Sequence, residues 1–370
     1  MRRILVLSTR DIRSKNSGGA SLYIYEILRR LSNKYEITIC SGIEDELPRR
    51  ERLCGMNIVR LPFRGFSRVA VPIAVLTNLF GPTDLIIDNG DVAFPWLTPL
   101  YSHTPTLTII YQSVREIFSR ELIRPISDMA TIAEPWIYKM YKRKKIVTCS
   151  QSTKTDLVEF GLRADDITVV KPGIRDSFLS SKSTPKFENP TVVCVSRFQK
   201  YKGIDYLIRA MKFVLQEVPS AELIIAGSGD ETNIERQLSG TDYSPSVKVI
   251  NRRSNQWDDE KRELFAKAHL SVVPSIREGY GIVVIEANAC GTPVIGWNVP
   301  GLRDSILDGK TGVLVPFGDV EKLGKQIALY LKDFTAREKM STAAVEWARE
   351  HSWDRSSSEF DRIIDSLAAK

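Results

Sequence analysis

Short apolar runs alternate with longer amphipathic stretches along the 370 residues of this chain. In the first half, runs rich in β-branched residues predict buried strands at residues 4–8, 37–41, 85–88, 106–110 and 146–150. Between the first two runs, apolar residues recur at the spacing of one helical face: Ile24, Ile27, Leu28 and Leu31. Strands that alternate with helices in this way predict parallel sheets with right-handed crossover connections.

The second half repeats this alternation after a polar stretch without periodicity, residues 177–190, which predicts a linker. Helices are predicted at residues 203–218 and 282–289, and strands at residues 191–196, 223–226, 247–250, 270–273, 293–296 and 313–315. We therefore predict an α/β fold of two doubly wound, Rossmann-like domains, residues 1–176 and 191–352. Their ligands are expected in the cleft between the domains, at the carboxyl ends of the strands.

The composition excludes several classes of protein. Hydrophobic residues make up 43% of the chain and charged residues 26%, which is ordinary for a globular protein and excludes wholesale disorder. The five cysteines are scattered and form no CxxC pair, and the three histidines lie far apart. We therefore expect no disulfide scaffold, no Cys- or His-based metal centre, and a reducing cytoplasm as the compartment.

Neither a signal peptide nor a membrane span is expected. The apolar run at residues 4–8 is too short for a signal-peptide core. The longest uncharged stretch, residues 92–114, contains three prolines. The first 180 residues carry 26 Lys and Arg against 19 Asp and Glu, whereas the remaining residues carry 26 of each. The net charge of +7 therefore belongs to the first half, where it favours an anionic partner or simply aids solubility.

The segment with the most informative chemistry follows the predicted strand at residues 270–273. A turn of Glu278, Gly279, Tyr280 and Gly281 opens an apolar helix that carries Glu286. Glycines let the backbone approach a ligand, and a helix N-terminus favours a phosphate. Two carboxylates would repel the phosphate but suit the hydroxyls of a sugar or ribose. The alternative is a helix cap at Glu278 and a solvated Glu286, but the surrounding residues predict that Glu286 is buried.

Two other segments offer groups that suit phosphates. Arg197 and Lys202 frame a short loop at the carboxyl end of the first strand of the second half, where they can clamp a diphosphate. Gly18 and Gly19 precede the first helix, where the glycines permit either a phosphate approach or a bare turn.

Together these motifs resemble the retaining glycosyltransferases of the GT-B fold, family four (glycosyl transferases group 1). The likeness is strong over residues 190–355 and looser over residues 1–175. Besides the two glutamates, it rests on residues 18–19, 147–150, 170–173, 196–203, 225–229, 293–295, 308–315 and 352–353.

The resemblance implies a hexosyltransferase that uses a nucleotide-diphosphate sugar and retains the anomeric configuration, through front-face attack with the leaving phosphate as base. Arg197 and Lys202 would hold the diphosphate and stabilise its charge as it leaves. Glu278 would accept hydrogen bonds from the donor sugar, and Glu286 would accept them from the ribose.

The resemblance also implies that backbone N–H groups of Gly279, Tyr280 and Gly281 face the donor. The first domain would bind the acceptor, while Gly18 and Gly19 close over the phosphates. The last helix, residues 353–370, would cross back to the first domain.

One position departs from the family. Relatives often carry a histidine after the strand at residues 106–110, whereas this chain has Tyr111 and Gln112 there. Tyr111 can hydrogen-bond a donor sugar but does not change charge near pH 7 as a histidine does. No Asp-x-Asp triplet occurs, so we expect no metal and no other cofactor. Arg, Lys and the helix dipole would then meet the charge of the leaving group.

The acceptor is expected to be a lipid-linked, glycan or other hydroxyl compound of cell-envelope glycan biosynthesis. Residues 138–145 and 63–76 of the basic first domain combine cations with apolar side chains, which suits peripheral contact with an anionic membrane. A helix that ends in cations beside a buried helix explains them equally. Nucleic acid is not expected, because no binding motif occurs.

Two other functions stay open. The missing histidine motivates a non-catalytic subunit that binds nucleotide sugars, and the two-domain fold is shared by sugar-nucleotide epimerases.

Overall fold

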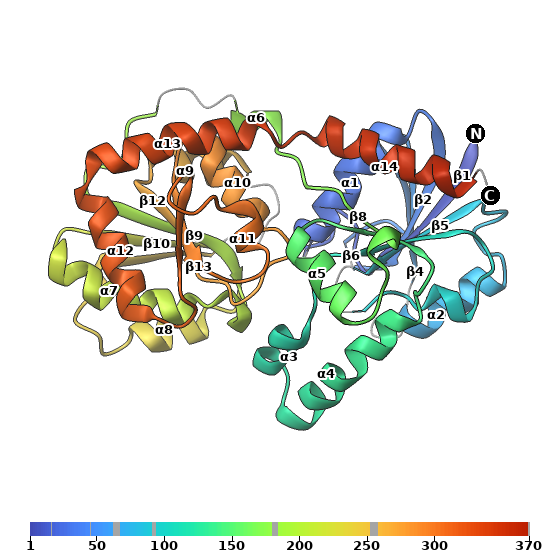
Figure 1. Ribbon diagram of the computed structural model, residues 1–370, viewed down its shortest axis with the longest axis horizontal. Coiled ribbons are helices and arrows are strands. Elements are labelled where there is room, and N and C mark those ends of the chain that lie inside the picture. Colours follow the sequence, from blue (N-terminus) through green and yellow to red (C-terminus); the bar gives the residue numbers. More distant parts are fainter. Residues whose placement is uncertain are drawn as a thin grey trace. The chain divides into compact units, whose positions relative to one another are not determined.

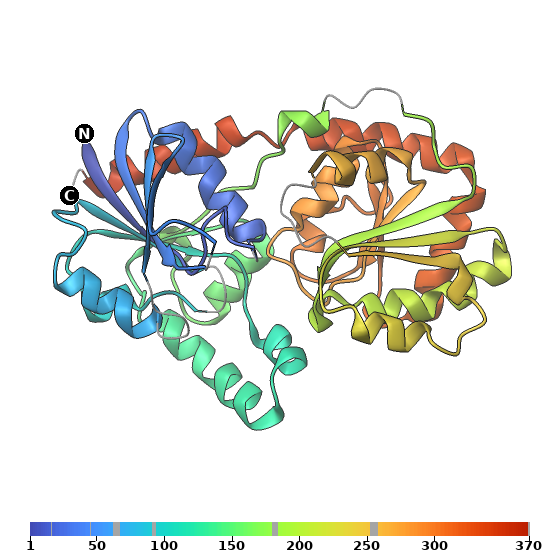
Figure 2. The same cartoon turned by 180° about the vertical axis from the view of Figure 1, so that it is seen from behind.

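The computed structural model describes residues 1–15, 17–44, 46–61, 67–90, 94–179, 184–251 and 258–368. Within these residues the chain forms two compact units, each built around its own sheet (Figures 1 and 2). The first unit contains Met1–Arg115, Pro125–Gly173 and Trp353–Lys370, and the second contains Glu116–Arg124 and Ile174–Ser352. Residues 63–66 of the predicted membrane surface and 180–183 of the predicted linker lie outside the described residues.

The sheet of the first unit has eight strands in the order β3-β4-β2-β1-β5-β6-β7-β8. All neighbours are parallel except β3 and β4. The strands are β1 (Arg2–Leu7), β2 (Tyr35–Gly42), β3 (Arg50–Leu53), β4 (Met56–Leu61), β5 (Leu85–Gly90), β6 (Thr106–Ile110), β7 (Lys145–Thr148) and β8 (Ile167–Val169). The five predicted strands are confirmed, whereas β3, β4 and β8 were not predicted.

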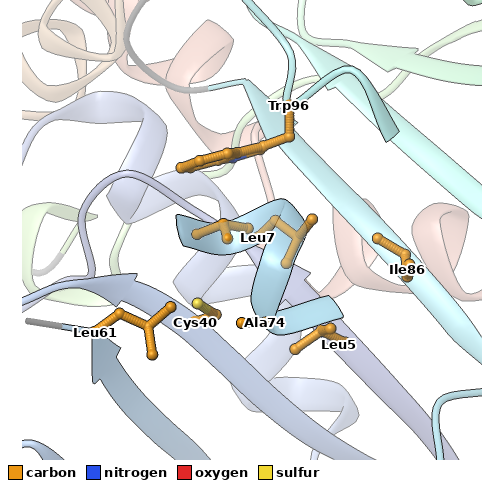
Figure 3. Packing of buried hydrophobic residues seen from close by; sticks show 8 residues of the cluster. Leu5, Leu7, Cys40, Leu61, Ala74, Ile86 and Trp96 are labelled. Atoms are coloured by element: carbon orange, nitrogen blue, oxygen red, sulfur yellow. The ribbon is translucent and has the colours of Figure 1, made fainter. Parts of the chain in front are cut away.

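The helices of the first unit include α1 (Gly19–Leu31), α2 (Ser67–Leu76), α4 (Arg124–Lys139), α5 (Gln151–Glu159) and α14 (Trp353–Ala368), with 3-10 turns η1 (Thr98–Leu100) and η2 (Ala164–Asp166). One face of the sheet packs against α2 through a cluster that includes Leu7, Cys40, Ala74 and Trp96 (Figure 3). These side chains come from β1, β2, α2 and the segment after β5. Their packing buries apolar surface and so holds these elements together near the carboxyl end of β1.

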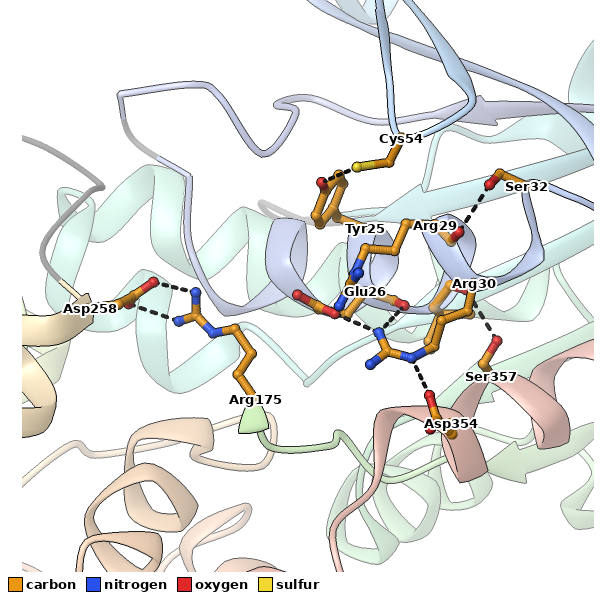
Figure 4. Close-up of polar contacts among 11 residues, drawn as sticks. Tyr25, Glu26, Arg29, Arg30, Ser32, Cys54, Arg175, Asp258, Asp354 and Ser357 are labelled. Carbon is orange, nitrogen blue, oxygen red and sulfur yellow. Dashed lines mark hydrogen bonds and ion pairs between the residues drawn. The ribbon is translucent and has the colours of Figure 1, made fainter. Parts of the chain in front are cut away.

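The last helix returns to the first unit, as predicted, and packs against α1 (Figure 1). Arg30 of α1 binds Asp354 of α14, with 2.5 Å between Nε and Oδ1, and also binds the buried Glu26 of α1 (Figure 4). The hydroxyl of Ser357 donates to the carbonyl oxygen of Ile27 at 3.2 Å. Phe360 and Ile364 are fully buried, so α14 is part of the core of the first unit.

The second unit has a six-stranded sheet in the order β11-β10-β9-β12-β13-β14, with all neighbours parallel. Its strands are β9 (Thr191–Phe198), β10 (Glu222–Gly229), β11 (Val247–Asn251), β12 (Leu270–Val273), β13 (Val294–Trp297) and β14 (Gly312–Val315). Each of the six overlaps a predicted strand. Near-continuous apolar runs made these strands predictable, because both faces of such a sheet are covered by helices.

Helices cover both faces of the sheet of the second unit (Figure 1). The helices that follow β8 and precede α14 are α6 (Asp176–Leu179), α7 (Ile204–Glu217), α8 (Thr232–Leu238), α9 (Asp258–Lys267), α10 (Ile282–Ala289), α11 (Leu302–Ser305), α12 (Val320–Lys332) and α13 (Phe334–Arg349), with 3-10 turns η3 (Lys200–Lys202) and η4 (Ser244–Ser246). Helix α3 (Arg115–Glu121), which comes from the first half of the sequence, belongs to this unit from Glu116 onward. Among the described residues of both units, no helix has the length and apolar character that crossing a bilayer requires.

Candidate functional site

Two loops of the second unit leave the same edge of its sheet. β9 and β12 are parallel neighbours, so the loop after β9 and the loop after β12 start side by side. The backbone N–H of Ile276 donates to the carbonyl oxygen of Tyr201 at 3.0 Å and joins the two loops. Gly203 adopts a φ of +67°, and a Cβ there would lie 2.0 Å from the carbonyl oxygen of Pro274. A glycine is therefore required where the loops meet.

The predicted residues Lys202 and Glu278 meet across this junction. The Nζ atom of Lys202 lies 2.6 Å from Oε1 of Glu278, and both side chains are largely buried. Burial opposes the charge on the ammonium group, but the carboxylate of Glu278 outweighs it and raises the pKa of Lys202. Lys202 is therefore a fixed cation at neutral pH, already oriented at the carboxyl end of β9.

Arg197, the other predicted cation, lies on the same loop. Its Nη2 atom donates to the hydroxyl of Tyr201 at 3.1 Å, and its positive charge lies close enough to oppose the charge on Lys202. Two cations that repel each other at a half-buried position favour a shared anionic ligand, because such a ligand relieves the repulsion.

The glycine turn after β12 brings the backbone close to Glu278. Gly281 has a φ of +89° and occupies the N-cap position of α10, where no side chain caps the helix. A Cβ on Gly301 would lie 2.1 Å from the carbonyl oxygen of Glu278, so a second glycine supports the turn. Gly279 is half-exposed, whereas the Tyr280 ring is buried and its hydroxyl lies 2.5 Å from Nε2 of His351. Only the backbone of Tyr280 therefore faces the turn.

Glu286 is buried on α10, with 4% of its surface exposed, which excludes the alternative of a solvated glutamate. Its Oε1 atom lies 2.7 Å from Nζ of Lys261 and 3.7 Å from Nη2 of Arg175. Both cations approach Oε1 in these ion pairs, and the hydrogen bond from Lys261 also goes to Oε1. The sequence predicted the burial of this carboxylate but not its two cationic neighbours.

The cations beside Glu286 are held by a second acid. Asp258, the first residue of α9, pairs with Arg175, with 2.8 Å between Oδ1 and Nη2 (Figure 4). Lys261, one turn later, lies 3.4 Å from the same carboxylate. Arg175 and Lys261 also lie over the ring of Phe178. No local pattern marks these residues, because Arg175 and Lys261 are 86 positions apart in the sequence.

Helix α3 adds residues to this site that the sequence did not indicate. Oε1 of Glu121 accepts the backbone N–H of Tyr201 at 3.0 Å, directly before Lys202. Oε1 of Glu116 lies 2.8 Å from Nη1 of the buried Arg277, directly before Glu278. Helix α3 therefore binds the immediate neighbours of both members of the Lys202–Glu278 pair.

The predicted residues of the first unit form a separate group. The hydroxyl of Tyr111 donates to Oδ1 of Asn89 at 2.8 Å and lies 3.1 Å from the carbonyl oxygen of Ala20. Gly18 is the N-cap residue of α1, has extended backbone angles, and is followed by the exposed Gly19. Tyr111 therefore lies beside the turn of Gly18 and Gly19, so these predicted residues can act on the same ligand.

The second unit thus presents fixed cations, carboxylate acceptors and an uncapped helix N-terminus at one sheet edge. These groups can receive a phosphate and several hydroxyls without a proton transfer from the protein. Two Rossmann-like units completed by a returning helix define the GT-B fold.

The chain belongs to family four of the glycosyltransferases. Residues 17–178 match Glycosyltransferase Family 4, and residues 177–347 match Glycosyl transferases group 1. An uncharacterized glycosyltransferase of Methanocaldococcus jannaschii is 31% identical over 91% of both chains. A D-inositol 3-phosphate glycosyltransferase of Corynebacterium aurimucosum is 26% identical over 95% of this chain and 91% of its own.

Solved structures share the fold at low sequence identity. The sucrose-phosphate synthase of Thermosynechococcus elongatus matches all of both chains, with a TM-score of 0.83 and 18% identity. HepE of Anabaena in complex with UDP-glucose matches 99% of this chain and 100% of its own, with a TM-score of 0.77 and 18% identity. The chain is therefore a glycosyltransferase enzyme with the expected fold.

Proposed function

We propose that this glycosyltransferase moves a hexose from a nucleotide-diphosphate sugar to a hydroxyl of a lipid-linked or glycan acceptor, with retention of configuration and without a metal. The observation that supports binding of the donor is the buried Lys202–Glu278 ion pair at the carboxyl edge of the second sheet. A UDP-sugar is the first donor to test, because HepE was solved with UDP-glucose.

In this proposal, the donor diphosphate binds between Arg197 and Lys202. Lys202 has three N–H donors, so it can bind phosphate oxygens while it holds Glu278. The carboxylate of Glu278 then accepts hydrogen bonds from sugar hydroxyls, and the N–H groups of Gly279, Tyr280 and Gly281 complete the contact. Oε2 of Glu286 accepts from the ribose hydroxyls, while Lys261 fixes the other oxygen.

The proposed chemical step conserves the anomeric configuration. The acceptor oxygen attacks the anomeric carbon on the face from which the phosphate leaves, and the bond between that carbon and the phosphate oxygen breaks. The proton of the acceptor hydroxyl passes to the departing phosphate oxygen. Arg197, Lys202 and the N-terminus of α10 stabilise the negative charge that develops on the diphosphate. Such electrostatic stabilisation of the transition state is usually the largest contribution of an active site to the rate.

We propose that the first unit binds the acceptor, with Gly18 and Gly19 beside the donor phosphates and Tyr111 beside the donor sugar. The enzyme would work in the cytoplasm with its basic first half toward the inner face of a membrane. The curated relative that acts on D-inositol 3-phosphate supports a phosphorylated polyol as one acceptor to test.

The test is transfer by the purified protein with UDP, GDP and ADP sugars in the presence of EDTA. We expect one donor class to release its nucleoside diphosphate, and NMR of the product to show the donor's anomeric configuration. The Glu286→Gln variant should raise the KM for that donor, because an amide binds hydroxyls less strongly than a carboxylate.

Four results would contradict the proposal. Complete loss of activity in EDTA would refute metal independence, and an inverted product would refute retention. Release of an isomerised sugar nucleotide without an acceptor would identify an epimerase, and tight donor binding without turnover would identify a binding subunit.

A further inference from the structure

Helix α4 buries polar side chains and exposes apolar ones, which is the opposite of the usual pattern for a surface helix. Its buried residues include Ser127, Glu134 and Tyr138, whereas Met129, Ile132 and Trp136 are 72%, 70% and 67% exposed. At about 100° per residue, the two sets lie on opposite sides of the helix. An isolated exposed apolar residue is ordinary, but a row along one helix face indicates a binding surface.

The buried contacts fix this orientation of α4. Oε1 of Glu134 accepts the backbone N–H of Val114 at 2.7 Å, and Oε2 accepts the hydroxyl of Ser113 at 3.1 Å. Rotation of α4 to bury its apolar side would expose Tyr138 and break these bonds. The apolar side is therefore left for a partner outside the chain.

Helix α2 exposes a second apolar row in the same part of the first unit. Val69, Ile73 and Leu76 follow the spacing of one helical face and are all exposed. Arg68 of α2 donates to the carbonyl oxygens of Phe94 and Pro95, and the ring of Phe94 lies 6.4 Å from that of Tyr138 in α4. The segment at residues 94–95 thus joins the two helices.

Cations border the apolar row of α4. Nζ of Lys139 lies 4.6 Å from the ring centre of Trp136, and Lys142 and Arg143 follow with exposed side chains. Arg124 is exposed at the other end of the helix, and Asp128 is the one exposed acid among the residues of α4. A tryptophan with lysines and arginines around apolar side chains suits an interface that is apolar inside and anionic at its boundary.

We infer that Ile126, Met129, Ile132 and Trp136, the α4 face, rest on an anionic lipid membrane. The apolar side chains would enter the boundary between headgroups and acyl chains, and Lys139, Lys142 and Arg143 would bind the headgroups. A second copy fits less well, because a two-fold contact would bring like cations together. The inference rests on the proposed function. Contact with the membrane would bring the first unit close to an acceptor that is anchored in the lipid.

The test is flotation of the full chain with vesicles of phosphatidylcholine, with and without about 30 mol% phosphatidylglycerol. We expect binding to the anionic vesicles and a loss of about tenfold or more in the Ile132→Ser/Trp136→Ser double variant, because each substitution removes apolar surface that the bilayer would bury. The matched control is Leu329→Ser, which removes an exposed leucine from α12 of the second unit. Replacement of Lys142 and Arg143 by Gln should abolish the preference for phosphatidylglycerol.

The inference is overturned if the wild type floats with neither vesicle, or if the double variant binds as well as the wild type. Light scattering that shows a dimer, which the double variant converts to monomer, would instead assign the α4 face to a second copy. Donor hydrolysis in solution separates this test from that of the proposed function. The double variant should keep that activity, and an enzyme without turnover can still bind vesicles through this face.

Discussion

At the scale of single residues, the second unit brings opposite charges together where water is largely excluded. Lys202 and Glu278 are paired, and Glu286 is held by Lys261 and Arg175. Removal of one member of a buried ion pair costs more than the pair contributes, because the remaining charge stays desolvated. Substitutions in these pairs therefore affect stability as well as activity, and the two effects must be separated by matched variants.

We predict that Lys202→Met lowers kcat/KM for transfer by about 100-fold or more, because it removes one of the two cations proposed to stabilise the leaving diphosphate. The variant should also lose stability, since Glu278 is left without its cation. Adding Glu278→Gln should restore the melting temperature but not the activity. Lys200→Met, an exposed neighbour on the same turn, is the control, and equal losses in both lysine variants would refute the role of Lys202.

A second prediction concerns acid stability. Burial, with Arg337 and Lys186 nearby, lowers the pKa of His269 to about 4, and Nδ1 accepts the backbone N–H of Thr191 at 3.0 Å. Between about pH 6.5 and pH 4 the unfolded chain therefore binds a proton that the folded chain does not. The free energy of unfolding should fall as the pH is lowered through this window.

Urea unfolding at several pH values measures this dependence. It should be weaker in His269→Asn, whose amide oxygen still accepts the bond but does not titrate. His103→Asn removes an exposed histidine and should leave the dependence unchanged. An unchanged slope in His269→Asn would assign the acid sensitivity to other groups.

At the scale of elements, the site depends on how closely neighbouring loops approach. The loops after β9 and β12 are in contact at Gly203, and α3 covers them from a distant part of the sequence. The position of Lys202 is thus set by two independent supports, one within the sheet edge and one from α3.

Gly203→Ala should destabilise the chain by about 3 kcal/mol or more, because a methyl group has no space beside Pro274 and φ is positive. Gly240→Ala is a matched control, since Gly240 also has a positive φ but nothing within 4 Å of its added Cβ. That control should cost only about 1–2 kcal/mol of backbone strain. Chemical denaturation measures both values, and equal losses would show that the close approach does not matter.

Glu121→Ala should raise the donor KM about threefold to tenfold with a smaller change in kcat, because the turn that carries Lys202 loses its bond from α3. Glu121→Gln should retain most of the affinity, since the amide oxygen also accepts an N–H. Glu159→Ala, which removes an exposed acid from α5, controls for charge. If Glu121→Ala binds donor as the wild type does, α3 has no part in positioning the turn.

The sequence predicted those elements whose character is set locally. Strands β6 and β12 were predicted to the residue, because buried parallel strands are short runs of mainly apolar and β-branched residues. Strand β3 was missed, since Arg-Glu-Arg-Leu at an antiparallel edge has no apolar run. The sequence placed Lys202 and Glu278 at strand ends that face one cleft, but their direct ion pair was not predicted. The contacts of Arg175, Lys261 and α3 could not be predicted, because they depend on which distant elements pack together.

At the scale of the whole molecule, the chain passes between the two units four times. The returning segment carries Trp353, Phe360 and Ile364 into the core of the first unit. The stability of the first unit therefore depends on residues that lie beyond the entire second unit in the sequence. The two units are expected to unfold in separable transitions.

Phe360→Ala should lower the transition of the first unit by about 3–5 kcal/mol, the usual cost of a cavity left by a buried phenylalanine. Calorimetry with and without a nucleoside diphosphate distinguishes the transitions, because a ligand of the second unit raises only that unit's melting temperature. A uniform loss in both transitions would indicate that the units unfold as one.

The return of α14 to α1 has a consequence for biosynthesis. A ribosome makes α1 and the first sheet early, yet the helix that covers them emerges only after all of β9 to α13 has been synthesised. Until then, the apolar surface that Phe360 and Ile364 later occupy is open to water and to other nascent chains. The fold of the first unit is thus completed only at the end of synthesis, and chaperone dependence should end once α14 has left the ribosome and packs against α1.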